Sequence, residues 1–224
     1  MDLLSQGIDI LCKNDSDIKA LISARREDII SLLVRYIKEI ELFNPAYGLV
    51  GVNSAEELII KHILDSLAPL GIISRLLKPL CAANESLKIA DAGSGAGLPG
   101  IPLAITLPEY DFSLIERMGR RAGFLCNTKA VLALSNITIT ESEIEKAAHN
   151  SFNLVTFRAF KPLDKKLLKT LQNVCVKGGV IAAYKGRQEK IKEEMASFGD
   201  GLSWEAIPCP VPFLDEERNL LVIR

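Results

Sequence analysis

The sequence lacks an excess of charge of either sign. Its 27 lysines and arginines are balanced by 28 aspartates and glutamates, which leaves a net charge of −1. This balance excludes a protein that holds nucleic acid through its overall charge. Any contact with nucleic acid must therefore come from local clusters of basic side chains.

Paired cysteines, long apolar runs and a leader-like start are also missing. The five cysteines are odd in number and scattered, with no Cys-x-x-Cys pair, which excludes a disulfide framework and a structural zinc site. No apolar run approaches the ~18 residues that a membrane helix needs. The first residues, MDLLSQGIDILCKND, carry no basic segment ahead of the apolar ones, unlike a secretory signal. We therefore expect a cytoplasmic protein without a metal and without a membrane contact.

The sequence predicts that the N-terminal third of the chain is helical. In the segment 25–43, apolar residues recur with a helical period, and a break is expected at Asn44-Pro45. Ser54 followed by Glu57 has the spacing of a capping box and predicts the start of another helix. We expect residues 1–83 to form a helical segment packed on a core domain formed by residues 84–224.

The remainder alternates between strand-like and helix-like segments. Strands are expected at 87–92, 111–116, 136–140, 152–160 and 178–186, with helices between them and one more helix at 188–198. Such alternation is typical of a parallel, doubly wound α/β sheet. The two last strands, 203–211 and 218–224, have no helix between them and predict an antiparallel hairpin at one edge.

The stretch DAGSGAGLPG, residues 91–100, follows the first of these strands and resembles a nucleotide-binding turn. The dinucleotide pattern G-x-G-x-x-G would need a third glycine at the position of Leu98, and no Gly-Lys-Ser/Thr follows as in a P-loop. Asp91 is unfavourable beside a pyrophosphate but suits a cationic ligand, and S-adenosylmethionine carries an ammonium and a sulfonium. The alternative is a tight turn that binds nothing.

Glu116 ends the second strand of this domain. An acidic side chain there can accept hydrogen bonds from both ribose hydroxyls of a bound nucleotide. The alternative is a surface carboxylate that caps the following helix.

Several motifs together resemble one protein family. They are IIKHILDSL (59–67), DAGSGAGLPGIPLAI (91–105), LIERMGRRAGFL (114–125), FRAF (157–160), YKGR (184–187) and ERNLLVIR (217–224). The chain resembles the bacterial small-subunit ribosomal RNA guanine-N7 methyltransferases, also called glucose-inhibited division protein B.

The resemblance implies a class I S-adenosylmethionine-dependent methyltransferase fold, a Rossmann-like, seven-stranded, mostly parallel sheet with N-terminal helices. It implies methyl transfer to a guanine of 16S ribosomal RNA near the decoding centre, with naked RNA or the small ribosomal subunit as the partner. With the motif reading above, the expected cofactor-binding residues are Asp91, Gly93, Ser94, Gly95, Gly97, Leu98, Glu116, Ile144, Glu145 and Arg158.

The N7 atom of guanine has a free lone pair and no proton, so its methylation needs no general base, only proximity and orientation. We therefore expect no acid/base or nucleophilic residue and interpret Cys209, after Pro208, as a packing cysteine. Positioning candidates are Arg158, His62 and Asp65. The alternatives are a salt bridge from Arg158 to Asp91 or Glu116, and simple helix packing for His62 and Asp65.

Three basic clusters follow strand ends, where ligands bind in such sheets. The RNA-binding candidates are Arg117, Arg120 and Arg121, then Lys161 and Lys165 with Lys166 and Lys169 beside them, and Lys185 with Arg187. Other functions remain open: a methyltransferase acting on another RNA or a small molecule, or a non-catalytic ribosome-assembly factor. An NAD-dependent oxidoreductase is a further alternative, which Leu98 disfavours because it stands where the dinucleotide pattern needs glycine.

One segment departs from the family pattern, because Tyr47 is followed by Gly-Leu-Val rather than by Asn-Leu-Thr. If this turn holds substrate, docking would differ in detail. We expect the protein to be a monomer.

Overall fold

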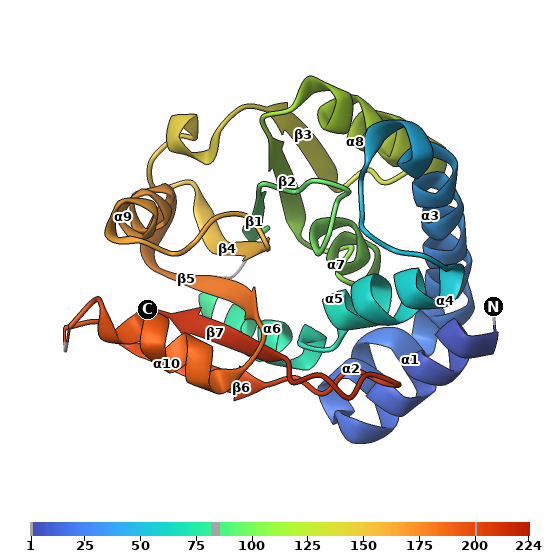
Figure 1. Cartoon of the computed structure of the whole chain (residues 1–224), viewed down its shortest axis with the longest axis horizontal. Helices are drawn as coiled ribbons and strands as arrows, with labels where there is room; N and C mark the ends of the chain where they lie inside the picture. The colour runs from blue at the N-terminus through green and yellow to red at the C-terminus, as the bar shows by residue number, and fades with distance from the viewer. Residues whose placement is uncertain (1, 82–85, 200) are drawn as a thin grey trace.

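A computed structural model describes residues 2–81, 86–199 and 201–224. Its centre is a seven-stranded sheet in the order β3-β2-β1-β4-β5-β7-β6 (Figure 1). The strands are β1 (Lys88–Ala92), β2 (Asp111–Glu116), β3 (Ile137–Glu141), β4 (Phe152–Arg158), β5 (Cys175–Lys185), β6 (Trp204–Pro208) and β7 (Asn219–Ile223). The predicted α/β class and the strand count are confirmed.

The strand directions explain where a ligand can bind. β1 to β5 are parallel neighbours in the sheet, whereas β7 runs antiparallel to both β5 and β6. The predicted C-terminal hairpin is therefore present, with β7 inserted between β5 and the edge strand β6. The strand order reverses between β1 and β4, and the carboxyl ends of strands beside such a reversal are the usual ligand site.

Apolar side chains alternate between the two faces of the sheet, as the period of a strand requires. Ile89 of β1 belongs to one hydrophobic cluster, and the next residue, Ala90, belongs to the other. The first cluster includes α7 (Gly100–Thr106) and α8 (Gly119–Leu132), and the second includes α9 (Lys165–Val174) and α10 (Gln188–Ala196). Helices thus cover both faces, which gives the predicted doubly wound arrangement.

The N-terminal third is helical, as predicted. It contains α1 (Asp2–Asn14), α2 (Ser16–Ile22), α3 (Arg26–Tyr47), α4 (Ala55–Leu58), a π-helix η2 (Ile59–Leu64), α5 (Asp65–Leu67) and α6 (Leu70–Leu77), with short 3₁₀ turns η1 (Ser23–Arg25) and η3 (Lys78–Leu80). These helices share one hydrophobic cluster with α7, α8 and the sheet. The expected boundary at residues 83 and 84 lies outside the described residues. Among the residues described, none of the helices has both the length and the apolar character to cross a membrane.

Two local expectations need correction. The helix expected to break at Asn44-Pro45 continues to Tyr47 and ends at Gly48, which has φ 58°. Pro45 lies in the last turn, and the Gly48 N–H still bonds the Asn44 carbonyl at 2.9 Å, so the left-handed glycine ends the helix instead of the proline. The helix that begins after Ser54 widens into the π-helix η2, which a regular helical period does not predict.

Candidate active site

Two neighbouring cavities lie at the carboxyl ends of the parallel strands. The larger cavity, of about 370 Å³, is bounded by η2, β4, β5 and the start of β7. The smaller cavity, of about 220 Å³, is bounded by Gly93 and the segments that follow β2, β3 and β4. Ala159 and Lys161 line both cavities, so the segment after β4 forms a shared wall.

The glycine turn after β1 depends on its glycines. Gly93, Gly95 and Gly97 have φ values of 69°, 59° and 90°, where side chains are strained. A Cβ atom at Gly93 would also overlap the ring of Phe160, and one at Gly97 would overlap Ile101. The sequence therefore needs glycine at these two positions for both conformation and space.

Asp91 lies beneath this turn and is fully buried. Its Oδ2 accepts hydrogen bonds from Ser94 Oγ at 2.6 Å and from Gly100 N at 3.0 Å. Within the described chain its Oδ1 has no hydrogen-bond partner. Burial raises the pKa of Asp91 to about 6, partly offset by these hydrogen bonds. A buried, unpartnered carboxylate oxygen fits a cationic ligand and does not fit a pyrophosphate.

Glu116 lines the smaller cavity and is almost completely buried. Its Oε2 accepts from Gly95 N at 2.9 Å, and its Oε1 accepts from Met118 N at 2.8 Å. The carboxylate thus supports the glycine turn and the start of α8 while facing the cavity. The alternative reading of a surface carboxylate that caps α8 is wrong, because the side chain is almost completely buried and α8 has no side-chain cap within the described residues; at that helix Glu116 bonds only the N–H of Met118, the residue before its first turn.

The structure brings only part of the expected cofactor set to a cavity wall. Gly93, Glu116, Ile144 and Glu145 line the smaller cavity, and Arg158 lines the larger one. The remaining candidates line neither cavity: Asp91, Ser94, Gly95, Gly97 and Leu98. Their direct contact with a cofactor stays a prediction, and their visible role is to shape the turn. Sequence reasoning missed Met118, Ser142, Glu143 and Phe160 on the smaller wall.

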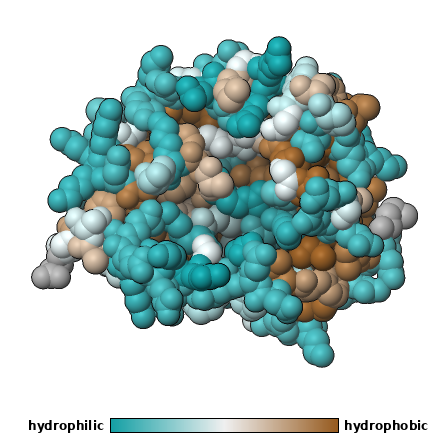
Figure 2. All heavy atoms as spheres, viewed as in Figure 1, coloured by the Kyte–Doolittle hydropathy of each residue, from teal (hydrophilic) through white to brown (hydrophobic). Residues whose placement is uncertain are grey.

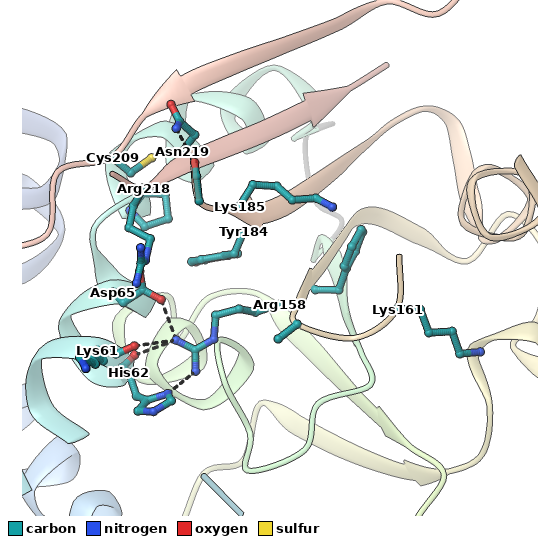
Figure 3. Close-up of a pocket in the computed structure, with 14 residues that line it drawn as sticks. Lys61, His62, Asp65, Arg158, Lys161, Tyr184, Lys185, Cys209, Arg218 and Asn219 are labelled. Atoms are coloured by element: carbon teal, nitrogen blue, oxygen red, sulfur yellow. Dashed lines mark hydrogen bonds and ion pairs between the residues drawn. The ribbon is translucent and has the colours of Figure 1, made fainter. Parts of the chain in front are cut away.

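Arg158 enters the larger cavity from the end of β4 and meets the widened turn of η2 (Figure 3). Its Nη1 donates to the carbonyls of Lys61 and His62 at 3.3 and 3.5 Å and to Asp65 Oδ2 at 2.7 Å. Its Nη2 lies 2.9 Å from His62 Nδ1. A π-helix often marks a functional site, and here the carbonyls of that helix accept hydrogen bonds from the guanidinium. The three predicted positioning residues therefore do lie together.

Asp65 joins Arg158 to a second arginine that the prediction missed. Arg218 Nε lies 3.2 Å from Asp65 Oδ1, on the other carboxylate oxygen, and Figure 3 shows Arg218 on the side of Asp65 opposite Arg158. The expected alternative, a salt bridge from Arg158 to Asp91 or Glu116, is wrong, because the ion-pair partner is Asp65. Arg218 stands in the motif ERNLLVIR, so the sequence contained a signal that was not given a role.

His62 is held in its neutral form. Burial, followed by the charge of Arg158, lowers its pKa to about 4. Because an arginine can only donate, His62 Nδ1 accepts from it, and the ring proton is left on Nε2. His62 is therefore a hydrogen-bond donor in the wall of the larger cavity at neutral pH.

Cys209 also contributes to this wall, but its thiol does not provide a nucleophile. The thiol is buried and donates to the Ile207 carbonyl at 3.3 Å. Burial raises the pKa of Cys209 to about 12, so the reactive thiolate is scarce at neutral pH. Its chemistry agrees with the expected packing cysteine.

The basic candidates differ in where they lie relative to the two cavities. Lys161 and Lys185 line the larger cavity and form ion pairs with Glu145 at 2.9 Å and with Glu194 at 2.7 Å. Arg117 and Arg121 line the smaller cavity, whereas Arg120, Lys165 and Arg187 line neither. Further members of the larger wall that the prediction missed are Lys61, Tyr184 and Asn219.

The segment that departs from the family pattern is held through its backbone. Asn44 Oδ1 accepts from Val50 N at 2.9 Å, and Asn44 Nδ2 donates to Val50 O at 3.0 Å. The Gly48 carbonyl accepts from Arg121 Nη2 at 3.4 Å. The turn is thus stabilised without the side chains that its sequence lacks.

Comparisons with known proteins agree with this geometry. The profile of the family described as GidB, rRNA small subunit methyltransferase G, matches residues 29–221. Ribosomal RNA small subunit methyltransferase G of Treponema denticola is 42% identical, over 99% of this chain and 95% of the relative. The protein of that name from Klebsiella pneumoniae is 36% identical, over 86% and 87% of the two chains.

Solved structures share the fold at low identity. A putative S-adenosylmethionine-dependent methyltransferase from Methanococcus maripaludis is 16% identical with a TM-score of 0.53, covering 84% of this chain and 90% of that one. An S-adenosylmethionine-dependent methyltransferase from Aquifex aeolicus is 14% identical with a TM-score of 0.53, covering 71% and 92%. The predicted class I methyltransferase fold is confirmed by these neighbours, and family membership confirms the enzyme class and the cofactor, S-adenosylmethionine. The chain belongs to the rRNA small subunit methyltransferase G family.

Proposed function

We propose that the protein transfers a methyl group from S-adenosylmethionine to the N7 atom of a guanine in 16S ribosomal RNA near the decoding centre. The observation that carries this proposal is the pair of cavities with a common wall at Ala159 and Lys161. A transfer between two bound molecules needs two adjoining sites. Family membership names small-subunit rRNA as the substrate class.

The smaller cavity would hold the adenosine part of the cofactor. Glu116 keeps free acceptor capacity toward the cavity for the ribose hydroxyls, since each carboxylate oxygen accepts only one backbone hydrogen bond. The buried Ile144 supplies an apolar surface for the adenine. The bound cofactor supplies an electrophilic methyl group on its sulfonium.

The larger cavity would receive the guanine. Arg158, Arg218 and neutral His62 present hydrogen-bond donors there, and guanine O6 and the RNA phosphates are acceptors. The N7 lone pair attacks without losing a proton, so these residues need only orient the base and exclude water. The cysteine and the tyrosine in this wall, Cys209 and Tyr184, both have pKa values raised by burial, which agrees with a site that works by positioning.

RNA docking would use the basic residues around the two cavities. Candidates are Arg117, Arg120, Arg121, Lys161, Lys165, Lys185 and Arg187. Arg117 and Arg120 form no ion pair within the described residues, so they are available to phosphates. Arg121 also lacks an ion pair there but donates to the Gly48 carbonyl, and Lys161 and Lys185 would first have to leave carboxylates. We further propose that the protein acts in the cytoplasm as a monomer, and light scattering on the purified protein would test its oligomeric state.

The direct test is methyl transfer from labelled S-adenosylmethionine to small ribosomal subunits that lack the modification, followed by nucleoside analysis. We expect label in 7-methylguanosine, and we expect Gly93→Asp to abolish it because the new side chain would collide with Phe160. Protein-free 16S RNA and a small-molecule extract serve as alternative acceptors. Cofactor binding without label in 7-methylguanosine would contradict the proposed acceptor.

A further inference from the structure

The hydroxyl of Tyr36 reaches the glycine turn from the N-terminal helices. Tyr36 lies in α3, is fully buried, and donates from its hydroxyl to the Ala96 carbonyl at 2.7 Å. Burial raises the pKa of Tyr36 well above its ordinary value, so the phenol keeps its proton and remains a donor. A buried tyrosine hydroxyl needs a partner, and here the partner is the backbone of the turn.

Ala96 stands between Gly95 and Gly97 in that turn. Within the described chain its carbonyl has no other hydrogen-bond donor. The neighbouring Gly95 N–H bonds Glu116 at 2.9 Å. The turn is thus held from two sides, by a carboxylate at the end of β2 and by a phenol from α3.

α3 is well placed to hold the turn steady because it is also bonded to α8. Glu39 Oε2 accepts from Asn127 Nδ2 at 2.7 Å, and Arg35 donates to the Val131 carbonyl. In Figure 1, α3 lies alongside α8 on the side of the sheet that carries α7. A shift of α3 would therefore move the hydroxyl away from the turn.

We propose that Tyr36 is a positioning residue for the cofactor, whose hydroxyl keeps the Gly93–Gly97 turn in the conformation that admits S-adenosylmethionine. A turn with three glycines at positive φ has many alternative conformations when it is not held. If the competent conformation is populated only in part, the apparent affinity falls by that fraction. The N-terminal helices would thus set the affinity for the cofactor.

The test is Tyr36→Phe, which removes one oxygen and keeps the ring in the core. Titration calorimetry with S-adenosylmethionine alone should give a Kd raised by about five- to tenfold, the effect of one buried hydrogen bond. At saturating cofactor, kcat and the KM for ribosomal subunits should remain as in the wild type. This separation would not follow from a general loss of structure.

Two control variants make the result specific. Glu39→Ala loosens α3 from α8 without touching Ala96, and Tyr110→Phe removes a hydroxyl whose one hydrogen bond within the described residues is with Cys81 Sγ at 3.9 Å. Tyr110→Phe should bind the cofactor as the wild type does, and Glu39→Ala, which leaves the Tyr36 hydroxyl and the Arg35 contact with α8 in place, should raise the Kd less than Tyr36→Phe. An unchanged Kd in Tyr36→Phe, or an equal rise in Glu39→Ala, would overturn the inference. Since no RNA is present in the titration, the result does not depend on which atom receives the methyl group.

Discussion

At the scale of single residues, the larger cavity depends on one carboxylate and two guanidinium groups. Asp65 is almost fully buried and pairs with Arg158 and Arg218 through different oxygens. Breaking such a buried pair by removing one partner typically costs about 3–5 kcal/mol. Arg158 therefore has a structural role beside the positioning role that we propose for it, and a conservative replacement can separate the two.

Arg158→Lys keeps the positive charge but cannot contact His62 Nδ1 and Asp65 at once with a planar fork. We expect the single-turnover rate of methyl transfer to fall about 100-fold through lost orientation. The control is Arg75→Lys, at an exposed arginine that pairs with Asp15 and Asp17. A wild-type rate in Arg158→Lys would show that the guanidinium does not orient the reacting groups.

The pH dependence of stability should carry a contribution from His62. Its pKa is lowered from 6.5 to about 4, so between these values the unfolded chain binds more protons than the folded one. The stabilisation is therefore complete above pH 6.5 and is lost as the pH falls toward 4. Asp91, whose pKa burial raises to about 6, acts in the opposite sense over much of this range. The informative quantity is thus the difference between variant and wild type.

We expect His62→Gln to lose less stability than the wild type when the pH falls from 7 to 4, by up to about 3 kcal/mol. Urea unfolding at several pH values measures this difference. His149→Gln, at an exposed histidine, is the control and should follow the wild-type curve. Parallel curves for His62→Gln and the wild type would mean that His62 titrates normally.

At the scale of elements, the turn between β1 and α7 carries the strongest constraint. Its backbone needs positive φ at three glycines, and the volume near Gly97 is filled by Ile101 and Leu125. By contrast, Gly123 in α8 is exposed and has open space around its Cα. An added methyl group should therefore be tolerated at Gly123 and not at Gly97.

Gly97→Ala should weaken cofactor binding by about 100-fold or more, because strain at positive φ and overlap with packed side chains add together. Gly123→Ala should bind the cofactor normally and raise the free energy of unfolding by about 0.5–1 kcal/mol. Calorimetric titration and thermal unfolding of both variants give the comparison. Normal binding by Gly97→Ala would contradict the assigned role of the turn.

At the scale of the whole molecule, charge distribution matters more than net charge. The net charge is −1, and hydrophilic residues dominate the face shown in Figure 2. The basic residues that follow β2 have no carboxylate partner within the described residues, whereas those in the larger cavity do. We therefore propose that phosphate contacts fall chiefly on the first group, Arg117, Arg120 and Arg121, of which Arg117 and Arg121 lie at the wall of the smaller cavity.

The double variant Arg117→Gln, Arg120→Gln should raise the KM for ribosomal subunits, measured at saturating S-adenosylmethionine because Arg117 also lines the smaller cavity. Its slope of log KM against log salt should be shallower by about two, one for each lost phosphate contact. Lys13→Gln with Lys19→Gln, on the distant helices α1 and α2, is the matched control. Equal slopes in all three proteins would place the RNA elsewhere.

Much of the fold was predictable because its signals are local. The strand at 111–116 has the predicted bounds, since its apolar residues and the polar residues at its two ends are neighbours in the sequence. Ser54 accepts from Glu57 N at 3.1 Å as the capping spacing predicts, although the Glu57 carboxylate bonds Asn53 N instead of the Ser54 N–H. The break at Pro45 was wrong because a glycine four residues after Asn44 could end the helix instead.

The candidate site likewise has a part that the sequence predicted and a part that it did not. The glycine turn, Glu116 and Arg158 stand beside strand ends, and strand ends can be located from sequence periodicity. By itself, the sequence therefore determined the succession of strands and helices along the chain, the glycine requirement of the turn after β1, and the preference for a cationic cofactor over a pyrophosphate. Arg218, Tyr36 and the widened helix η2 act across 60 to 153 residues of chain, for example from Tyr36 to Ala96 and from Asp65 to Arg218. Only the tertiary structure decided those contacts, because a hydrogen bond between distant segments depends on how the packed helices and strands bring them together.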